Sequence, residues 1–164
     1  MNYEQVLRYA MQMEIDGMNF FNEKAELFSN PTTTKLFKNL AKIEHEHYKY
    51  LERQLNSYLE NNEFDLSDEV MEREVDIFKN REESEHIKET LTESDIPDMT
   101  ILRTAYLIER DFKEFYENAA NNAEDEGIKQ IFTKLAKWEA GHEALFKKEH
   151  DRLMKEYMTL PWGG

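Results

Sequence analysis

No cysteine occurs among the 164 residues of this chain, and glycine and proline are scarce, with five and three copies. Without cysteine the chain can form no disulfide, thiolate zinc site, iron–sulfur cluster or thiol nucleophile, and its composition agrees with a reducing, cytoplasmic compartment. No apolar run approaches the ~18 residues that a membrane-spanning helix requires, so we expect no membrane partner. The first residues show no basic region followed by an apolar run, so we expect no signal peptide.

Positive charge is also scarce. Lysine and arginine together number 21, against 35 aspartates and glutamates, which leaves a formal net charge of −14 at pH 7. Affinity for nucleic acid depends on basic side chains that displace counterions from phosphates, so we expect no nucleic-acid partner. The acidic balance favours solubility, and it would also attract cations toward a metal site.

What the sequence does contain is a helical pattern. Apolar residues recur at three- and four-residue spacing almost throughout, which predicts an all-α fold. We expect one domain, residues 1–160, followed by a tail at 161–164. Its predicted helices cover residues 3–28, 32–60, 98–124 and 127–158, with a crossover at 61–97. Asn2 and Gln5 are placed to cap the first helix. The inner row of that helix is predicted as Val6, Ala10, Met13, Gly17, Phe20 and Leu27.

The lengths of the connections predict how these helices are arranged. Short loops join the first helix to the second and the third to the fourth, so each pair should form an antiparallel hairpin. Residues 61–97 are too many for a hairpin loop but enough to span a bundle ~40 Å long, which returns the third helix in the direction of the second. One or two short helical segments are expected within this crossover. The prediction is a ferritin-like antiparallel four-helix bundle with a long crossover.

A repeat of 95 residues carries the chemistry. Two Glu-x-x-His motifs, at 44–47 and 139–142, lie 95 residues apart, and each follows a lone glutamate by 30 residues. The superposed positions are Glu14 with Glu109, Glu44 with Glu139, and His47 with His142. The same shift superposes Phe20 on Phe115, Ala25 on Ala120, Phe37 on Phe132, Leu40 on Leu135, Ala41 on Ala136 and Lys42 on Lys137. A duplicated helix pair, each copy holding half of a two-metal site, explains the repeat.

Their common level along the helices and their charge make these six residues candidate metal ligands. Glu14 lies about fifteen residues before the first hairpin turn and Glu44 about fifteen after it, so at ~1.5 Å per residue both reach nearly the same level. Four buried carboxylates in one layer repel one another and lose hydration unless they are protonated or bind cations. Two divalent metals would neutralise them. An oxygen-rich ligand set with two histidines suits iron or manganese, and zinc would compete for it.

A third motif, Glu83-x-x-His86, serves as an internal control. Arg53, not a glutamate, stands 30 residues before it, and its neighbours in the chain are polar. We interpret this copy as part of a solvated face of the crossover, with no metal role.

The repeated motifs resemble those of the rubrerythrin-related branch of the ferritin-like di-iron family, over residues 3–60 and 98–155. The resemblance is carried by Phe37-x-x-Leu40-Ala41-x-x-Glu44-x-x-His47 and Phe132-x-x-Leu135-Ala136-x-x-Glu139-x-x-His142, preceded by Glu14, Phe21 and Ala25 and by Glu109, Tyr116 and Ala120. It implies a dinuclear iron centre with Glu44 and Glu139 as bridging carboxylates. Glu14, Glu44 and His47 would lie nearer one iron. Glu109, Glu139 and His142 would lie nearer the other.

Two features depart from that family. Rubrerythrins add a cysteine-ligated rubredoxin domain that supplies electrons, whereas this chain has no cysteine. The reductant would therefore be a separate electron-donor protein or ferrous iron itself. Rubrerythrins also carry an extra glutamate one turn after the third-helix ligand, where this chain has Phe112. The remaining six ligands are similar to those of bacterioferritin ferroxidase centres and di-iron oxygenases.

The resemblance implies a di-iron oxidoreductase that reduces hydrogen peroxide or dioxygen, in oxidative stress or iron handling. Phe21, Phe112 and Tyr116 would line its pocket, and Tyr116 would hydrogen-bond a ligand carboxylate or supply an electron. The alternatives are an organic-substrate oxygenase, an iron-storage protein, and a non-catalytic helical module that holds zinc. We expect a homodimer, in which the long crossover would also permit exchange of helix pairs between protomers.

Three alanine substitutions test the ligand set. Glu44→Ala and Glu139→Ala should each abolish stoichiometric binding of two metal ions, because each removes a carboxylate that both ions would need. Glu83→Ala, the matched control, should bind metal as the unmodified chain does. Metal analysis after equilibrium dialysis gives the stoichiometry, and two bound ions in either of the first two variants would refute the assignment.

Overall fold

The computed structural model describes residues 1–29, 31–66 and 95–160, and within these ranges the chain forms four long helices and no strand. The helices are α1 (Tyr3–Ala25), α2 (Pro31–Asn61), α4 (Asp95–Asn122) and α5 (Glu126–Thr159). None of the described helices is both long and apolar enough to cross a membrane.

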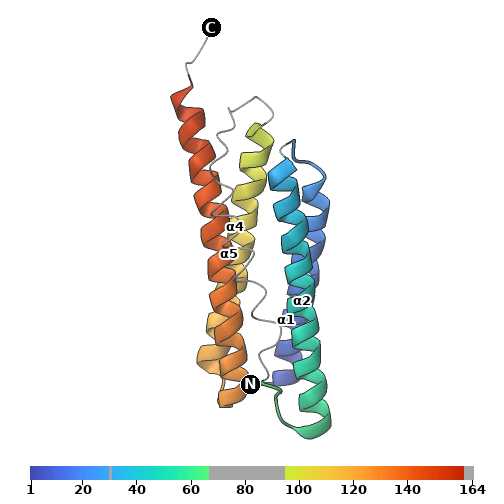
Figure 1. Ribbon diagram of the computed structural model, residues 1–164. Coiled ribbons are helices and arrows are strands. Elements are labelled where there is room, and N and C mark those ends of the chain that lie inside the picture. The colour runs from blue at the N-terminus through green and yellow to red at the C-terminus, as the bar shows by residue number, and fades with distance from the viewer. Residues whose placement is uncertain (30, 67–94, 161–164) are drawn as a thin grey trace.

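The helices form two hairpins that lie side by side. In Figure 1, α1 (blue) and α2 (cyan to green) form one antiparallel hairpin, and α4 (yellow) and α5 (orange to red) form the other. Because α2 and α4 run in the same direction, the end of α2 and the start of α4 lie at opposite ends of the bundle. The predicted all-α, ferritin-like four-helix bundle is thereby confirmed. The predicted segments inside the crossover and the tail fall in 67–94 and 161–164, outside the described residues, and the single domain at 1–160 stays a prediction.

Side chains that precede two of the helices satisfy backbone N–H groups of the first turn. Asn2 Oδ1 accepts a hydrogen bond from the Gln5 N–H, with 3.1 Å between the heavy atoms. Asp125 Oδ1 accepts one from the Ile128 N–H at 3.0 Å. Such caps replace hydrogen bonds that the first turn of a helix cannot make within itself, so α1 and α5 begin at defined residues.

Two helix ends differ from the prediction by three residues. α1 ends at Ala25, because the Leu27 N–H donates to the Lys24 carbonyl at 2.9 Å, a bond that tightens the chain out of the α-helical path. α4 begins at Asp95, before the predicted start. Pro97 then falls in the first turn, where its missing N–H costs no intrahelical hydrogen bond. The other helix ends lie within two residues of their predicted positions.

The inner row of α1 also differs from the prediction. Its buried residues are Leu7, Ala10, Glu14, Gly17, Phe21 and Ala25. Val6, Met13 and Phe20 are only partly buried, and Leu27 is 60% exposed. The predicted row followed bulky apolar side chains that lie at the edge of the buried stripe. The row that faces the interior is the one that continues at helical spacing through Glu14.

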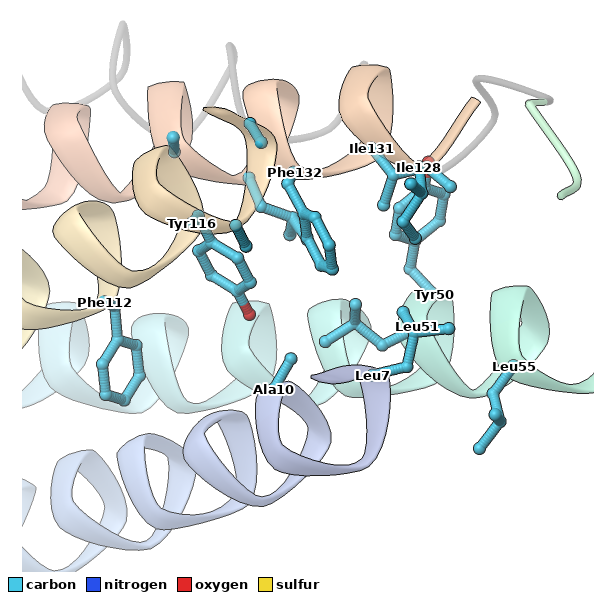
Figure 2. Close-up of a cluster of buried hydrophobic side chains, with 14 residues drawn as sticks. Leu7, Ala10, Tyr50, Leu51, Leu55, Phe112, Tyr116, Ile128, Ile131 and Phe132 are labelled. Carbon is cyan, nitrogen blue, oxygen red and sulfur yellow. The ribbon is translucent and has the colours of Figure 1, made fainter. Parts of the chain in front are cut away.

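Two apolar clusters fill the bundle, and the candidate ligands lie between them. One cluster, shown in Figure 2, contains Leu7, Ala10, Tyr50, Leu51, Leu55, Phe112, Tyr116, Ala119, Ala120, Ile128, Ile131, Phe132, Leu135 and Ala136. The other contains Phe21, Ala25, Phe28, Leu36, Phe37, Leu40, Ala41, Ile43, Leu102, Ala105 and Phe146. On every helix the glutamate that the repeat identifies falls between members of the two clusters, so a polar layer crosses an otherwise apolar interior.

Gly17 of α1 is closely approached by Phe112 of α4. A Cβ atom added at Gly17 would lie 3.1 Å from Phe112 Cε2, 3.4 Å from Phe112 Cζ and 3.6 Å from Glu44 Cγ. The Phe112 ring therefore occupies space beside Glu44 that a side chain on α1 would otherwise fill. Positions 17 and 112 correspond in the 95-residue repeat. The second copy thus places a phenylalanine ring where it meets a glycine of the first copy.

A double-mutant cycle tests this contact. Gly17→Ala should gain about 1 kcal/mol of helix propensity, but the new methyl group against Phe112 should cost about 1–3 kcal/mol through overpacking. In a Phe112→Leu background the same Gly17→Ala change should stabilise the protein. Urea unfolding of the four proteins in one metal-free buffer measures the coupling. An effect of Gly17→Ala that is equal in both backgrounds would contradict the contact.

Candidate metal centre

The six predicted ligands lie together in the polar layer of the bundle. α1 contributes Glu14, α2 contributes Glu44 and His47, α4 contributes Glu109, and α5 contributes Glu139 and His142. None of the six is more than 1% exposed. Residues three apart lie on neighbouring turns of one helix face, so each hairpin presents two carboxylates and one imidazole to the interior.

These residues form two overlapping groups, each able to hold a metal ion. The first group is Glu14, Glu44, His47 and Glu139, and the second is Glu44, Glu109, Glu139 and His142. Within each group one ligand atom per residue lies within 4.8 Å of all the others. Glu44 and Glu139 belong to both groups. The third motif, Glu83-x-x-His86, lies outside the described residues.

The two shared glutamates face both histidines, each with a different oxygen. His47 Nδ1 lies 3.3 Å from Glu44 Oε2 and 3.3 Å from Glu139 Oε1. His142 Nδ1 lies 3.7 Å from Glu44 Oε1 and 3.2 Å from Glu139 Oε2. One oxygen of each shared carboxylate is thus directed to each half of the site, an arrangement suited to bridging two ions.

Burial and mutual repulsion act strongly on the carboxyl groups. Burial raises the pKa of Glu44 well above its ordinary 4.5, and the negative charges of the three neighbouring glutamates raise it further. Burial likewise raises the pKa of Glu109, although the charge of His142 opposes the shift. Burial also acts to raise the pKa of Glu139, but the adjacent imidazoles of His142 and His47 outweigh it and lower that pKa. The four glutamates of the layer, if all were ionised, would therefore carry more negative charge than its two histidines can neutralise.

Most carboxylate oxygens of the four glutamates have no hydrogen-bond partner among the described residues. Both oxygens of Glu44, both of Glu109, Oε2 of Glu14 and Oε1 of Glu139 are buried in this state. Burying such oxygens without a partner is costly, and two divalent cations would both pair with them and neutralise their charge. The residues present therefore fit a pair of metal ions with oxygen-rich ligands and one histidine each.

Glu14 is held from outside the site by Tyr116. The Tyr116 hydroxyl donates a hydrogen bond to Glu14 Oε1, and in Figure 2 it points from α4 toward the α1–α2 hairpin. Burial raises the pKa of Tyr116, and the charge of Glu14 raises it further, so the hydroxyl stays protonated. This bond occupies one oxygen of Glu14 and leaves Oε2 directed into the site, 3.4 Å from His47 Nδ1.

The two phenylalanines predicted to line the pocket have different surroundings. Phe112 is beside the site, against Gly17 and near Glu44. Phe21 is fully buried, and its ring packs 5.5 Å from the Phe37 ring and 5.6 Å from the Phe146 ring, centroid to centroid. Phe21 therefore serves the apolar cluster that bounds the site.

Trp138 of α5 also contacts the site, and motif reasoning alone does not find it. Its ring stacks on that of His47, with centroids 4.9 Å apart and planes 11° apart. Tryptophan has no metal-ligating atom, so a search for ligand spacing passes over it. The signal in the sequence is a mismatch in the repeat, since Trp138 corresponds to Ile43.

A helical bundle with a buried layer of four glutamates and two histidines defines the ferritin-like class of dinuclear carboxylate proteins. Comparison with protein families gives a narrower answer, because the family model described as Rubrerythrin matches residues 5–150. The chain belongs to the rubrerythrin family, and its buried cluster is accordingly a candidate two-metal site of the di-iron carboxylate type. Searches of curated proteins and of solved structures returned no match.

The raised pKa values predict how the metal-free protein responds to pH. A carboxyl group whose pKa is higher in the folded state than in the unfolded state stabilises the fold when it is protonated. That stability is complete below the ordinary value of 4.5 and is lost as pH rises through the raised value. Because of Glu44 and Glu109, the metal-free protein should resist urea better at about pH 5.5 than at about pH 7.5. The lowered pKa of Glu139 acts in the opposite direction, but only below 4.5.

A double variant separates this effect from the general repulsion of an acidic surface. Glu44→Gln with Glu109→Gln keeps the surface charge but removes both titrating groups, so its stability should vary much less between the two pH values. The protein loaded with two metal ions should not lose stability between these two pH values, because the ions hold the carboxylates ionised and the histidines neutral. Equal pH dependence in the variant and the unmodified chain would contradict the explanation.

Proposed function

We propose that the site holds two iron ions and that the protein is an oxidoreductase that reduces hydrogen peroxide or dioxygen. The observation that carries the proposal is the sharing of Glu44 and Glu139 by two four-residue groups, with one oxygen of each directed to each histidine. Two ions held this way can act together on one small oxidant. The match to the rubrerythrin family supports iron as the metal.

When bound, two ferrous ions would supply two electrons, enough to reduce hydrogen peroxide to water or dioxygen to hydrogen peroxide. Oxidation would raise the charge of the bound ions, and the ligands differ in how far their binding could change in response. Among the described residues, neither oxygen of Glu44 or of Glu109 has a hydrogen-bond partner, so each carboxylate could bind through one oxygen or through both. Glu14 differs from them, because its Oε1 accepts a hydrogen bond from Tyr116. This hydrogen bond limits the rotation of the Glu14 carboxylate, whereas no hydrogen bond among the described residues limits that of Glu109.

Burial favours a small oxidant over an organic substrate. The six ligands are at most 1% exposed, and apolar clusters adjoin the layer on both sides. Phe112 fills the space between α1 and α4 beside Glu44. A molecule of two oxygen atoms requires far less opening of such a wall than an organic substrate does, which supports peroxide or dioxygen over the oxygenase alternative.

The electrons must be replaced after each reaction. Because the chain has no cysteine with which to hold a rubredoxin-type iron, we propose that a separate electron-donor protein or further ferrous iron supplies them. The proposed setting is the cytoplasm, with removal of oxidant or oxidation of iron as the role and a homodimer as the working form. Gel filtration distinguishes such a dimer from the cage of an iron-storage protein.

Anaerobic loading with two ferrous ions per chain, followed by rapid mixing with hydrogen peroxide or dioxygen, tests the proposal. The protein-bound iron should be oxidised far faster than ferrous iron in buffer by at least one of the two. A faster reaction with peroxide identifies a peroxidase, and a faster reaction with dioxygen identifies a ferroxidase. Glu44→Ala should lose the rate enhancement. Bound iron that reacts no faster than free iron, or a site that retains zinc and refuses iron, would overturn the proposal.

A further inference from the structure

We propose that Trp138 is the residue through which electrons enter the metal pair from an external one-electron donor. This inference rests on the proposed function, because it concerns the reductive half of that reaction. The Trp138 ring, from α5, stacks on the ring of His47, from α2, at 4.9 Å and 11°. The His47 ring is in turn nearly parallel to that of His142, at 6.0 Å and 16°. Trp138 is therefore linked through the His47 ring to the His142 ring, so each candidate metal group has one histidine in this series of ring contacts.

Exposure distinguishes Trp138 from the other aromatic residues beside the site. The ligands themselves are at most 1% exposed, and Tyr116 is completely buried. Phe112 is also buried. Trp138 is only partly buried, so it reaches the surface while it remains in contact with His47. Because electron transfer slows steeply with distance through protein, a conjugated ring that joins a ligand to the surface shortens the path that a donor requires.

Within the described residues, the repeat does not place an aromatic ring at the corresponding position of the other half of the site. The position that corresponds to Trp138 in the first copy is Ile43, an aliphatic residue that is 6% exposed. An aliphatic side chain offers no conjugated path to His142, the histidine of the second group. The two copies keep the same ligands but differ here in the residue that would connect a ligand to the surface. The difference places the electron entry at the His47 side.

The electron balance of the proposed step is simple. A donor protein that carries one ferrous iron loses one electron and becomes ferric, and one ferric ion of the pair becomes ferrous. Two such transfers restore the pair, and Trp138 is neither oxidised nor reduced overall. If Trp138 served only to pack against the core, its replacement would change stability but not the rate of this step.

Stopped-flow reduction of the oxidised, iron-loaded protein by a reduced rubredoxin, a one-iron electron-transfer protein, tests the role. Trp138→Leu should slow reduction several-fold, and Trp138→Phe, which keeps an aromatic ring, should restore part of the rate. The matched control is Tyr9→Leu, because Tyr9 is an exposed aromatic residue (59% exposed) that packs on Phe115. Iron stoichiometry and reoxidation by the preferred oxidant should be unchanged in all three variants.

Fluorescence provides a second readout that needs no reaction. In a Trp162→Phe background Trp138 is the sole tryptophan, and cobalt(II) bound beside His47 should quench its emission. Failure of the unmodified protein to bind or oxidise iron would count against the proposed function, and the cobalt titration would still test the Trp138 contact. Reduction of Trp138→Leu at the unmodified rate, or cobalt binding without quenching, would overturn the inference. Should Trp138→Leu fail to fold, Trp138→Phe and the cobalt titration decide.

Discussion

The mutual repulsion of four carboxylates in an apolar interior is the constraint on which the rest of this structure depends. Water cannot screen these groups, because apolar clusters adjoin their layer on both sides. The two histidines compensate part of the charge, and they do so chiefly at Glu139, whose pKa they lower. Tyr116 satisfies one oxygen of Glu14. The remaining oxygens have no hydrogen-bond partner among the described residues. They are suited to pair with cations, since well-packed apolar side chains at the same positions would often stabilise a bundle more.

Features set by the period of the chain could be predicted from the sequence, and features set by the docking of the two hairpins could not. The helices, their order and the meeting of the six candidate ligands follow from helical spacing and from a repeat of 95 residues. The Trp138–His47 stack and the approach of Phe112 to Gly17 join residues of different hairpins. No local pattern records such a contact. The predicted inner row of α1 is right at Ala10 and Gly17 and wrong at its bulkier members, because burial follows helical spacing through Glu14 and not side-chain bulk.

The duplicated halves are equal in their ligands and unequal in their surroundings. Tyr116 donates to Glu14, whereas the corresponding residue of the first copy, Phe21, has no hydroxyl to donate. Accordingly one oxygen of Glu14 accepts a hydrogen bond, while neither oxygen of Glu109 does so from any residue that the structure describes. The corresponding positions 17 and 112 also differ between the copies, because the phenylalanine of the second copy packs against the glycine of the first. The ligand set preserves the symmetry of the repeat, and the residues around it make the two metal positions chemically distinct.

Each candidate metal group takes ligands from both hairpins, although the helices pack most densely within each hairpin. A bound ion would therefore join the two hairpins, and part of its binding free energy would stabilise their docking. When the ions are lost, the contacts between the two hairpins would open more readily than the contacts within each hairpin. Amide hydrogen exchange along α1, α2, α4 and α5 would then report metal occupancy.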